Sequence, residues 1–289
     1  MPFCFERKNR DQAVPELANN VPLCEKNRST VMIPCTEENR AYWSARAPGY
    51  GNVHRREWTS GQRDVWRRAL EGRLRAHFAQ RDPSTVRVLE VGTGPGFFAM
   101  LLAQAGYRVT AVDYTPAMLE QARLNAGDLL ERIGFMQMDA ENLDFADESF
   151  DAVISRNLTW NLPHPGLAYA HWSRVLKRGG LLLNFDANWY RYLSDVEAAK
   201  GHAADRERVA AGHVPDDTAG TDVAAMEALA RRAGLTAHAR PAWDVRMLTA
   251  LGLSVRADHE IWREVWTHAE HANNASTPLF MVHAVKPDC

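Results

Sequence analysis

The segment from residue 86 to 99, VRVLEVGTGPGFFA, constrains the fold of this chain more than any other part of it. It reads as a short apolar strand, a glycine-rich turn and the start of a helix, which together bring backbone amides and a helix N-terminus close to a ligand. The glycines Gly92, Gly94 and Gly96 follow a G-x-G-x-G spacing. Dinucleotide-binding turns follow G-x-G-x-x-G and would need a glycine at Phe97. The spacing therefore disfavours a nicotinamide-dependent oxidoreductase.

An acidic residue near the end of this strand narrows the ligand further. Glu90 lies two residues before Gly92, where its charge would repel a pyrophosphate. A carboxylate at this position suits a ligand that carries a cationic amino group and no phosphates. The turn is thus expected to bind a small cationic ligand.

Acidic residues also end the next two expected strands. Residues 107–113 read as a strand that ends in Asp113, and residues 134–141 read as a strand with Asp139 near its end. A carboxylate can accept hydrogen bonds from both hydroxyls of a ribose. In open α/β sheets ligands bind at the carboxyl ends of the strands, so we expect Asp113 to bind a ribose. Thr115 and Pro116 then begin a helix as N-cap and first helical residue.

The order of these motifs resembles that of the class I S-adenosylmethionine-dependent methyltransferases, and most closely the ubiquinone/menaquinone-type small-molecule enzymes. Residues 174–180 (RVLKRGG) are similar to a further turn of this family, with Arg178 where proline is usual. The resemblance is firm over residues 82–186. It implies S-adenosylmethionine as the cofactor. It also implies an α/β fold, a Rossmann-like doubly wound sheet of about seven strands with the last strand antiparallel and with helical cap segments.

The resemblance also assigns cofactor contacts to individual residues. Asp139 would accept a hydrogen bond from the adenine amino group, and the backbone of Ala140 would complete that edge. Residues around the helix that carries Met118 would pack on the adenine. The cofactor-binding residues expected in this way are Tyr50, Glu90, Gly92, Thr93, Gly94, Gly96, Asp113, Tyr114, Met118, Asp139, Ala140 and Asn157.

The segment after the fourth expected strand, residues 149–157, bears on the methyl acceptor. Enzymes that methylate the amino groups of bases or glutamine amides carry a [D/N/S]-P-P-[Y/F/W] loop here. Residues 156–163 read RNLTWNLP instead, which counts against base methylation. Methyl transfer is an in-line displacement, so the protein mainly positions the acceptor and excludes water. A general base is needed only when the acceptor must lose a proton of high pKa. The residues proposed to act on the acceptor are Asn157, His164, Asp186 and Tyr190.

The chain divides into five expected parts. Residues 1–35 are polar and punctuated by prolines and are expected to be a disordered leader. Residues 36–81 form an N-terminal helical cover, 82–186 the cofactor-binding core and 187–221 a cap insertion. Residues 222–289 complete the core, with a sixth strand at 235–240, a last strand at 279–285 and a helical insertion between them.

Composition limits the partners. The 289 residues carry a net charge of −2, and no apolar stretch is long enough to span a bilayer. We therefore expect a cytoplasmic protein, a monomer or homodimer, that acts on a small molecule and binds neither nucleic acid nor membrane. No metal is expected, although Glu264, His268 and His271 share one face of a probable helix. Two alternatives stay open: a protein or RNA methyltransferase, and a non-catalytic S-adenosylmethionine-binding protein.

Overall fold

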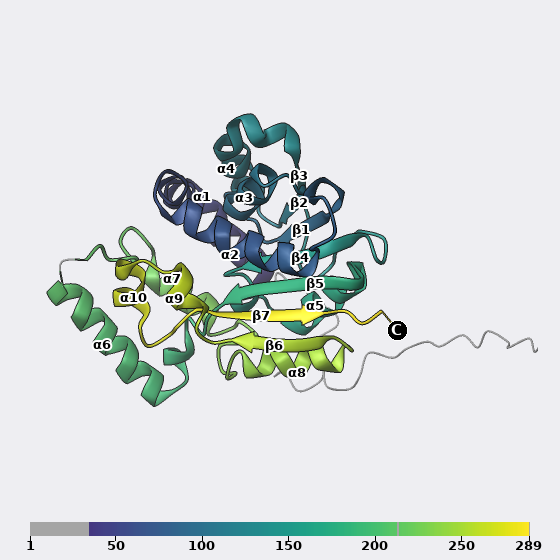
Figure 1. Cartoon of the computed structure of the whole chain (residues 1–289). Coiled ribbons are helices and arrows are strands. Elements are labelled where there is room, and N and C mark those ends of the chain that lie inside the picture. The colour runs from purple at the N-terminus through teal and green to yellow at the C-terminus, as the bar shows by residue number, and fades with distance from the viewer. Residues whose placement is uncertain (1–34, 213, 289) are drawn as a thin grey trace, which may run out of the picture. The chain divides into compact units, whose positions relative to one another are not determined.

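The computed structural model describes residues 35–212 and 214–288, which are traced by coloured ribbons in Figure 1. Their strands form one seven-stranded sheet in the order β3-β2-β1-β4-β5-β7-β6. The strands are β1 (Arg87–Val91), β2 (Arg108–Asp113), β3 (Ile133–Gln137), β4 (Phe150–Arg156), β5 (Leu176–Asp186), β6 (Ser254–Asp258) and β7 (Phe280–Val285). Strands β1 to β5 are parallel, and β7 runs antiparallel to both of its neighbours. The doubly wound α/β sheet with an antiparallel last strand is therefore confirmed.

Helices cover both faces of the sheet because successive strand residues point to opposite sides. On one face, residues such as Val88 and Ile154 pack against α2, α3 and α9. On the other face, Leu89 and Val153 pack against α5 and α8. The α-helices are α1 (Cys35–Thr59), α2 (Gln62–His77), α3 (Phe97–Gln104), α4 (Pro116–Ala126), α5 (Pro165–Val175), α6 (Val196–Gly212), α7 (Val223–Ala230), α8 (Ala242–Ala250), α9 (Ile261–Val265) and α10 (His268–Asn274).

The strand order places the carboxyl ends that matter for ligand binding side by side. β1 lies between β2 and β4. The chain therefore continues from β1 toward the β3 edge of the sheet and then crosses back to form β4 on the other side of β1. Such a reversal opens a crevice at the carboxyl ends of the central strands. The segments after Val91, Asp113 and Arg156 therefore meet at one edge.

The expected sixth strand at residues 235–240 is wrong. This segment is a series of turns, and the strand that pairs with β7 is β6, with Ser254 opposite Val285. Figure 1 shows β5, β7 and β6 side by side. Residues 235–240 alternate apolar and polar side chains as a strand does. Instead, the Arg240 side chain joins a buried ion-pair network with Asp186 and Asp244, which holds this segment beside α8.

That buried network joins the end of β5 to α8. Arg240 donates to Asp186 at 2.8 Å and to Asp244 at 2.7 Å. Thr159 donates to Asp186 at 2.5 Å, and the side chains of Asp186 and Asp244 are inaccessible to solvent. Two carboxylates therefore surround one guanidinium in the interior, an arrangement that needs all three partners.

The proposed leader, residues 1–35, lies outside the described residues except for Cys35, where α1 begins. Among the described helices, none combines the length and the apolar character that crossing a membrane requires.

Candidate active site

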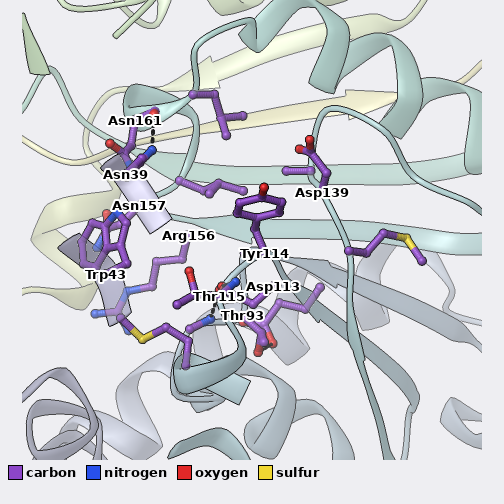
Figure 2. A pocket seen from close by; sticks show the side chains of 18 of the residues that line it. Asn39, Trp43, Thr93, Asp113, Tyr114, Thr115, Asp139, Arg156, Asn157 and Asn161 are labelled. Carbon is purple, nitrogen blue, oxygen red and sulfur yellow. Dashed lines mark hydrogen bonds between the residues drawn. The ribbon is translucent and has the colours of Figure 1, made fainter. Parts of the chain in front are cut away.

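A cavity of about 1020 Å³, open to solvent, lies at the carboxyl ends of β1, β2 and β4. Figure 2 shows Trp43, Asn39, Asn157 and Asn161 on one side of it and Asp139 on the other, with Tyr114 between them. The lining residues are Asn39, Arg40, Trp43, Tyr50, His54, Glu90, Gly92, Thr93, Gly94, Phe97, Phe98, Asp113, Tyr114, Thr115, Met118, Met138, Asp139, Ala140, Glu141, Arg156, Asn157, Leu158, Asn161, Leu162 and Pro163.

The glycine-rich turn forms the floor of the cavity. Gly92 has φ +70°, a conformation that favours glycine, and a Cβ there would lie 2.6 Å from the side chain of Leu158, which would have to move. Gly96 does not line the cavity. Gly96 has φ +89° and lies against Ala122, so that a Cβ on Gly96 would be 3.1 Å from the Ala122 side chain. The absence of a side chain at Gly96 therefore lets α3 pack closely on α4. Gly96 is thus a packing residue rather than a contact residue.

Glu90 is buried beneath this turn. Its carboxyl accepts a hydrogen bond of 2.6 Å from Thr93. Burial raises the pKa of Glu90 to about 8, although the Thr93 bond opposes the rise. The carboxyl is therefore protonated at neutral pH when the cavity is empty, and a cationic ligand would favour its ionised form.

Asp113, at the end of β2, is held in place by backbone amides. Its two carboxylate oxygens accept from the Gly94 amide at 2.9 Å and the Thr115 amide at 2.8 Å. The Thr115 hydroxyl makes no capping bond to α4, and Asp113 holds the Thr115 amide directly before that helix. Because each carboxylate oxygen can accept more than one bond, Asp113 keeps acceptor capacity for a ligand.

Asp139 and Ala140 mark the far side of the cavity. One oxygen of Asp139 accepts from the Glu141 amide at 2.8 Å, and burial raises the pKa of Asp139. The carbonyl of Ala140 accepts from the Trp172 indole at 3.0 Å. The second oxygen of Asp139 and the amide N–H of Ala140 are thus the groups of these residues that a ligand would meet.

An aromatic wall faces these residues and is made by Trp43, Tyr50 and His54 of α1 together with Phe97 of α3. The ring centroids follow each other at 5.8 Å from Trp43 to Tyr50, 4.8 Å from Tyr50 to His54 and 5.8 Å from His54 to Phe97. Spacings of this size are typical of favourable aromatic contacts. The wall gives this part of the cavity a largely apolar surface of rings that are inclined to one another by 50° to 62°.

A buried ion pair lies behind the aromatic wall. Arg156, the last residue of β4, donates to Glu57 of α1 at 2.6 Å. The Arg156 guanidinium also lies 4.7 Å from the Trp66 ring and 5.4 Å from the Phe97 ring. The pair thereby fastens α1 onto the end of β4 and fixes the position of the aromatic wall.

The loop after β4 closes the same side of the cavity. Asn157 has φ +54°, and its amide donates to the Phe185 carbonyl at 2.8 Å. The Oδ1 atom of Asn157 is buried without a hydrogen-bond partner. Asn161 donates to Asn39 at 3.0 Å, which joins the loop to α1. A buried acceptor without a partner indicates that a ligand donor belongs there.

The expected cofactor residues come together in this cavity with one exception. Tyr50, Glu90, Gly92, Thr93, Gly94, Asp113, Tyr114, Met118, Asp139, Ala140 and Asn157 all line it, and Gly96 does not. Their contacts to the cofactor stay predictions, since what the structure provides is their common position.

Three of the four residues expected to act on the acceptor lie away from the cavity lining, and only Asn157 belongs to it. The His164 side chain is 60% exposed and bonds to Glu141. Asp186 is fully occupied by the Arg240 network, and Tyr190 stacks on Trp160 with ring centroids 4.8 Å apart. We therefore do not retain these three as proton acceptors.

Sequence reasoning missed several lining residues. Asn39, Arg40, His54, Glu141 and Arg156 were not singled out. His54 follows Tyr50 by four residues on one helix, a spacing that places both side chains on the same face. That spacing could have identified His54. No comparable signal brings Arg156 and Glu57 together, because they are 99 residues apart.

The conserved-domain comparison agrees with this geometry: residues 89–184 match the profile of a methyltransferase domain. A phosphatidylethanolamine N-methyltransferase of Cereibacter sphaeroides is 37% identical over 117 residues, 39% of this chain and 57% of that protein. A ubiquinone biosynthesis O-methyltransferase of Alkalilimnicola ehrlichii is 36% identical over 32% of this chain and 38% of that protein. A demethylmenaquinone methyltransferase of Deinococcus radiodurans is 38% identical over 41% of this chain and 47% of that protein. The chain spans about half the length of these curated relatives.

Solved structures share the fold. A proposed sarcosine dimethylglycine methyltransferase from Galdieria sulphuraria matches 77% of this chain and 85% of its own, with a TM-score of 0.52 and 14% identity. A phosphoethanolamine N-methyltransferase 2 of Haemonchus contortus, in complex with S-adenosyl-L-methionine, matches 74% of this chain and 51% of its own, with a TM-score of 0.50 and 17% identity. At these identities the likeness concerns the fold alone. Together with the domain match, it confirms the resemblance to class I S-adenosylmethionine-dependent methyltransferases drawn from the sequence.

Proposed function

We propose that this chain transfers a methyl group from S-adenosylmethionine to a small-molecule acceptor. The premise is that residues 89–184 are a class I S-adenosylmethionine-dependent methyltransferase domain. One observation carries the proposal. The carboxyl groups of Glu90, Asp113 and Asp139, each at or near the end of a different strand segment, line one cavity whose other side is the aromatic wall. This arrangement suits a cofactor on one side and an acceptor on the other.

The residues present fit the proposed cofactor. Asp113 retains acceptor capacity for two ribose hydroxyls, and Asp139 with the Ala140 amide offers an acceptor and a donor to an adenine edge. Glu90, protonated in the empty cavity, would ionise beside a cationic amino group. When bound, S-adenosylmethionine supplies a methyl group activated by a sulfonium sulfur. The protein's part is then to orient the acceptor and exclude water.

The opposite side of the cavity supports a small acceptor. Trp43 and Tyr50 of α1 enclose it, and the hydrogen-bonded pair Asn39 and Asn161 joins α1 to the loop after β4. A cavity with a mostly apolar lining and a few polar groups is typical of small-molecule sites. The named relatives include a ubiquinone biosynthesis O-methyltransferase, a demethylmenaquinone methyltransferase and a phosphatidylethanolamine N-methyltransferase, none of which is named for a protein or RNA acceptor.

The experiment that tests this function uses S-adenosylmethionine labelled in its methyl group. The full-length protein is incubated with the labelled cofactor and fractionated cell extract, and the label is followed by molecular mass. We expect label in the low-mass fraction, where mass spectrometry then identifies the acceptor. A reaction with boiled protein serves as the blank.

The other outcomes separate the alternatives. Label in protein or RNA would replace the small-molecule acceptor by a macromolecule while keeping the cofactor. Cofactor binding without any transfer to a complete set of fractions would favour a non-catalytic binding protein. Failure to bind S-adenosylhomocysteine would contradict the cofactor assignment itself.

A further inference from the structure

We propose that His54 takes up the proton that the methyl acceptor loses, and that Glu57 positions His54. The methyl acceptor is then an uncharged, ring-containing molecule that reacts through a hydroxyl group. This inference rests on the proposed function and deepens it. Its starting point is a buried atom: Nδ1 of His54 has no hydrogen-bond partner, although the side chain lines the cavity. Buried polar atoms are seldom left unpaired, so a bound ligand would supply the partner that Nδ1 lacks.

The surroundings of the ring decide which nitrogen carries the proton. The Nε2 atom of His54 lies 3.8 Å from Oε2 of Glu57, one turn along α1. A carboxylate on that side favours a proton on Nε2, which leaves the lone pair of Nδ1 free. The distance exceeds that of a hydrogen bond, and catalytic hydrogen bonds in ligand-free structures are often long and shorten in the complex.

Arg156 keeps Glu57 in the form that this arrangement needs. Burial disfavours a charge on Glu57, yet the Arg156 guanidinium 2.6 Å away overcomes it and holds the pKa of Glu57 below its usual value. Burial also lowers the pKa of His54 to about 4. At neutral pH Glu57 is thus ionised and His54 is neutral. Because a pKa this low makes the imidazole a weak base, proton uptake depends on ionised Glu57 to stabilise the imidazolium.

The charges near His54 indicate what kind of acceptor fits. Arg156 is neutralised by Glu57, and Arg40 is paired with Glu37. The side of the cavity near the aromatic wall therefore offers no unpaired charge to balance a charged acceptor, and burying an unpaired charge is costly. The aromatic side chains of Trp43, Tyr50 and Phe97 offer edges and faces on which an uncharged ring can pack.

A second unpartnered atom points to the same chemistry. Oδ1 of Asn157 is buried without a partner and lines the same cavity as His54. Oδ1 of Asn157 and Nδ1 of His54 can both accept a hydrogen bond, so a methyl acceptor that carries hydrogen-bond donors suits this site. A molecule with hydroxyl groups on a ring meets this requirement without carrying a charge.

The proposed step balances in atoms and charge. The hydroxyl proton passes to Nδ1 of His54 while the hydroxyl oxygen forms a bond to the transferred methyl carbon. The carbon–sulfur bond breaks and its electron pair stays on sulfur, so the positive charge moves from the sulfonium to the imidazolium of His54. The imidazolium faces ionised Glu57 until it returns the proton to water.

The test uses two substitutions of His54 and one matched control. His54→Phe keeps an aromatic ring against Tyr50 and Phe97, and His54→Asn keeps a polar group. The control is His283→Asn in β7, a half-buried histidine whose pKa burial also lowers to about 4 and which does not line the cavity. Transfer of labelled methyl groups to the low-mass fraction and the affinity for S-adenosylhomocysteine are measured for each.

We expect both His54 variants to lose transfer by roughly 10²- to 10⁴-fold, the range that general acid–base catalysis contributes. Their affinity for S-adenosylhomocysteine should change less than about fivefold, because the binding contacts proposed above do not involve His54. The control should keep both quantities. Loss of S-adenosylhomocysteine affinity in step with transfer would mean that His54 binds the cofactor, and unchanged transfer would mean that it moves no proton.

Two further readouts do not depend on the rate. Nitrogen NMR of the wild-type protein with S-adenosylhomocysteine should show the His54 proton on Nε2, and a proton on Nδ1 would overturn the proposal. The product should be a methyl ether, and an N-methyl or S-methyl product would overturn the hydroxyl acceptor. Absence of any transfer by wild-type protein that binds the cofactor would instead contradict the proposed function, and the inference would fall with it.

Discussion

At the scale of single residues, the cavity uses its carboxyl groups in different ways. The carboxylate of Asp113 is fixed by the amides of Gly94 and Thr115. The carboxyl of Glu90 is buried, and its hydrogen-bond donors are one hydroxyl and one amide. Amide donors stabilise a carboxylate, and burial destabilises it. Burial raises the pKa of both carboxyl groups, and to about 8 for Glu90. Asp113 can therefore provide a fixed hydrogen-bond acceptor, whereas Glu90 is the carboxyl group expected to ionise on ligand binding.

Replacement of Asp113 should weaken cofactor binding strongly. Asp113→Ala would leave two ribose hydroxyls without acceptors, at a cost of about 1–3 kcal/mol for each bond to a charged group. Isothermal calorimetry with S-adenosylhomocysteine measures the loss. Asp144→Ala, at an exposed acid outside the cavity, is the control and should bind normally. Normal affinity in Asp113→Ala would remove the ribose assignment.

Cofactor affinity should depend on pH through Glu90. In the empty protein its pKa is raised to about 8, and a cationic amino group favours the ionised carboxylate, so binding must release a proton below that pH. Affinity for S-adenosylhomocysteine should rise by up to about tenfold for each pH unit between pH 6.5 and 8. Glu90→Gln should flatten this rise. A rise of equal slope in Glu90→Gln would assign the proton to another group.

At the scale of elements, the site depends on contacts between segments that are far apart in the chain. Glu57 and Arg156 fasten α1 to β4, and Asp186, Arg240 and Asp244 fasten β5 to α8. Removing one member of a buried ion pair leaves its partner without compensation. Such networks therefore fix how the covering helices lie on the sheet.

The network around Arg240 gives a stability prediction. Arg240→Met removes the cation and leaves Asp186 and Asp244 buried without it, which should lower the free energy of unfolding by about 3–5 kcal/mol. Urea denaturation followed by circular dichroism measures the change. Lys200→Ala, which removes an exposed pair with Glu197 on α6, should change it by less than about 1 kcal/mol. Similar small effects for both variants would show that the interior network adds little.

The glycine-rich turn gives a second stability prediction. Gly96→Ala adds a Cβ at φ +89° and 3.1 Å from Ala122, so it should lower the free energy of unfolding by about 1–3 kcal/mol. Gly72 of α2 provides the opposite case, because a Cβ there meets nothing within 4 Å. Gly72→Ala should be neutral or stabilise by about 0.5–1 kcal/mol. Equal effects of the two variants would contradict the packing role of Gly96.

At the scale of the whole molecule, the cavity draws its lining from α1, α3, α4 and the ends of three central strands. A ligand there contacts both the sheet and its helical cover. Binding only to the folded state stabilises it by about 2.7 kcal/mol at a ligand concentration one hundred times Kd. S-adenosylhomocysteine at that excess should raise Tm and slow proteolytic cleavage within α1. A raised Tm with unchanged cleavage of α1 would mean that α1 does not cover the bound ligand.

The sequence alone predicted the core of this molecule well. The strand, glycine turn and helix at residues 86–104 match β1 and α3, and Asp113 and Asp139 lie beside them in one cavity. These features are local: hydrophobic periodicity sets each strand, and parallel pairing then brings the strand ends to one edge. The cofactor side could be predicted for that reason.

The acceptor side was decided by tertiary structure alone. Asp186 follows a strand just as Asp113 does, yet Arg240, 54 residues later, buries it in an ion-pair network. His54 becomes a candidate proton acceptor only because α1 packs beside β4, which places its side chain at the cavity and leaves Nδ1 buried without a partner. Likewise, residues 235–240 and β6 both alternate in polarity, and only pairing with β7 selects the second. Local patterns specify elements, whereas charge pairing and burial across long separations decide which side chains reach the site.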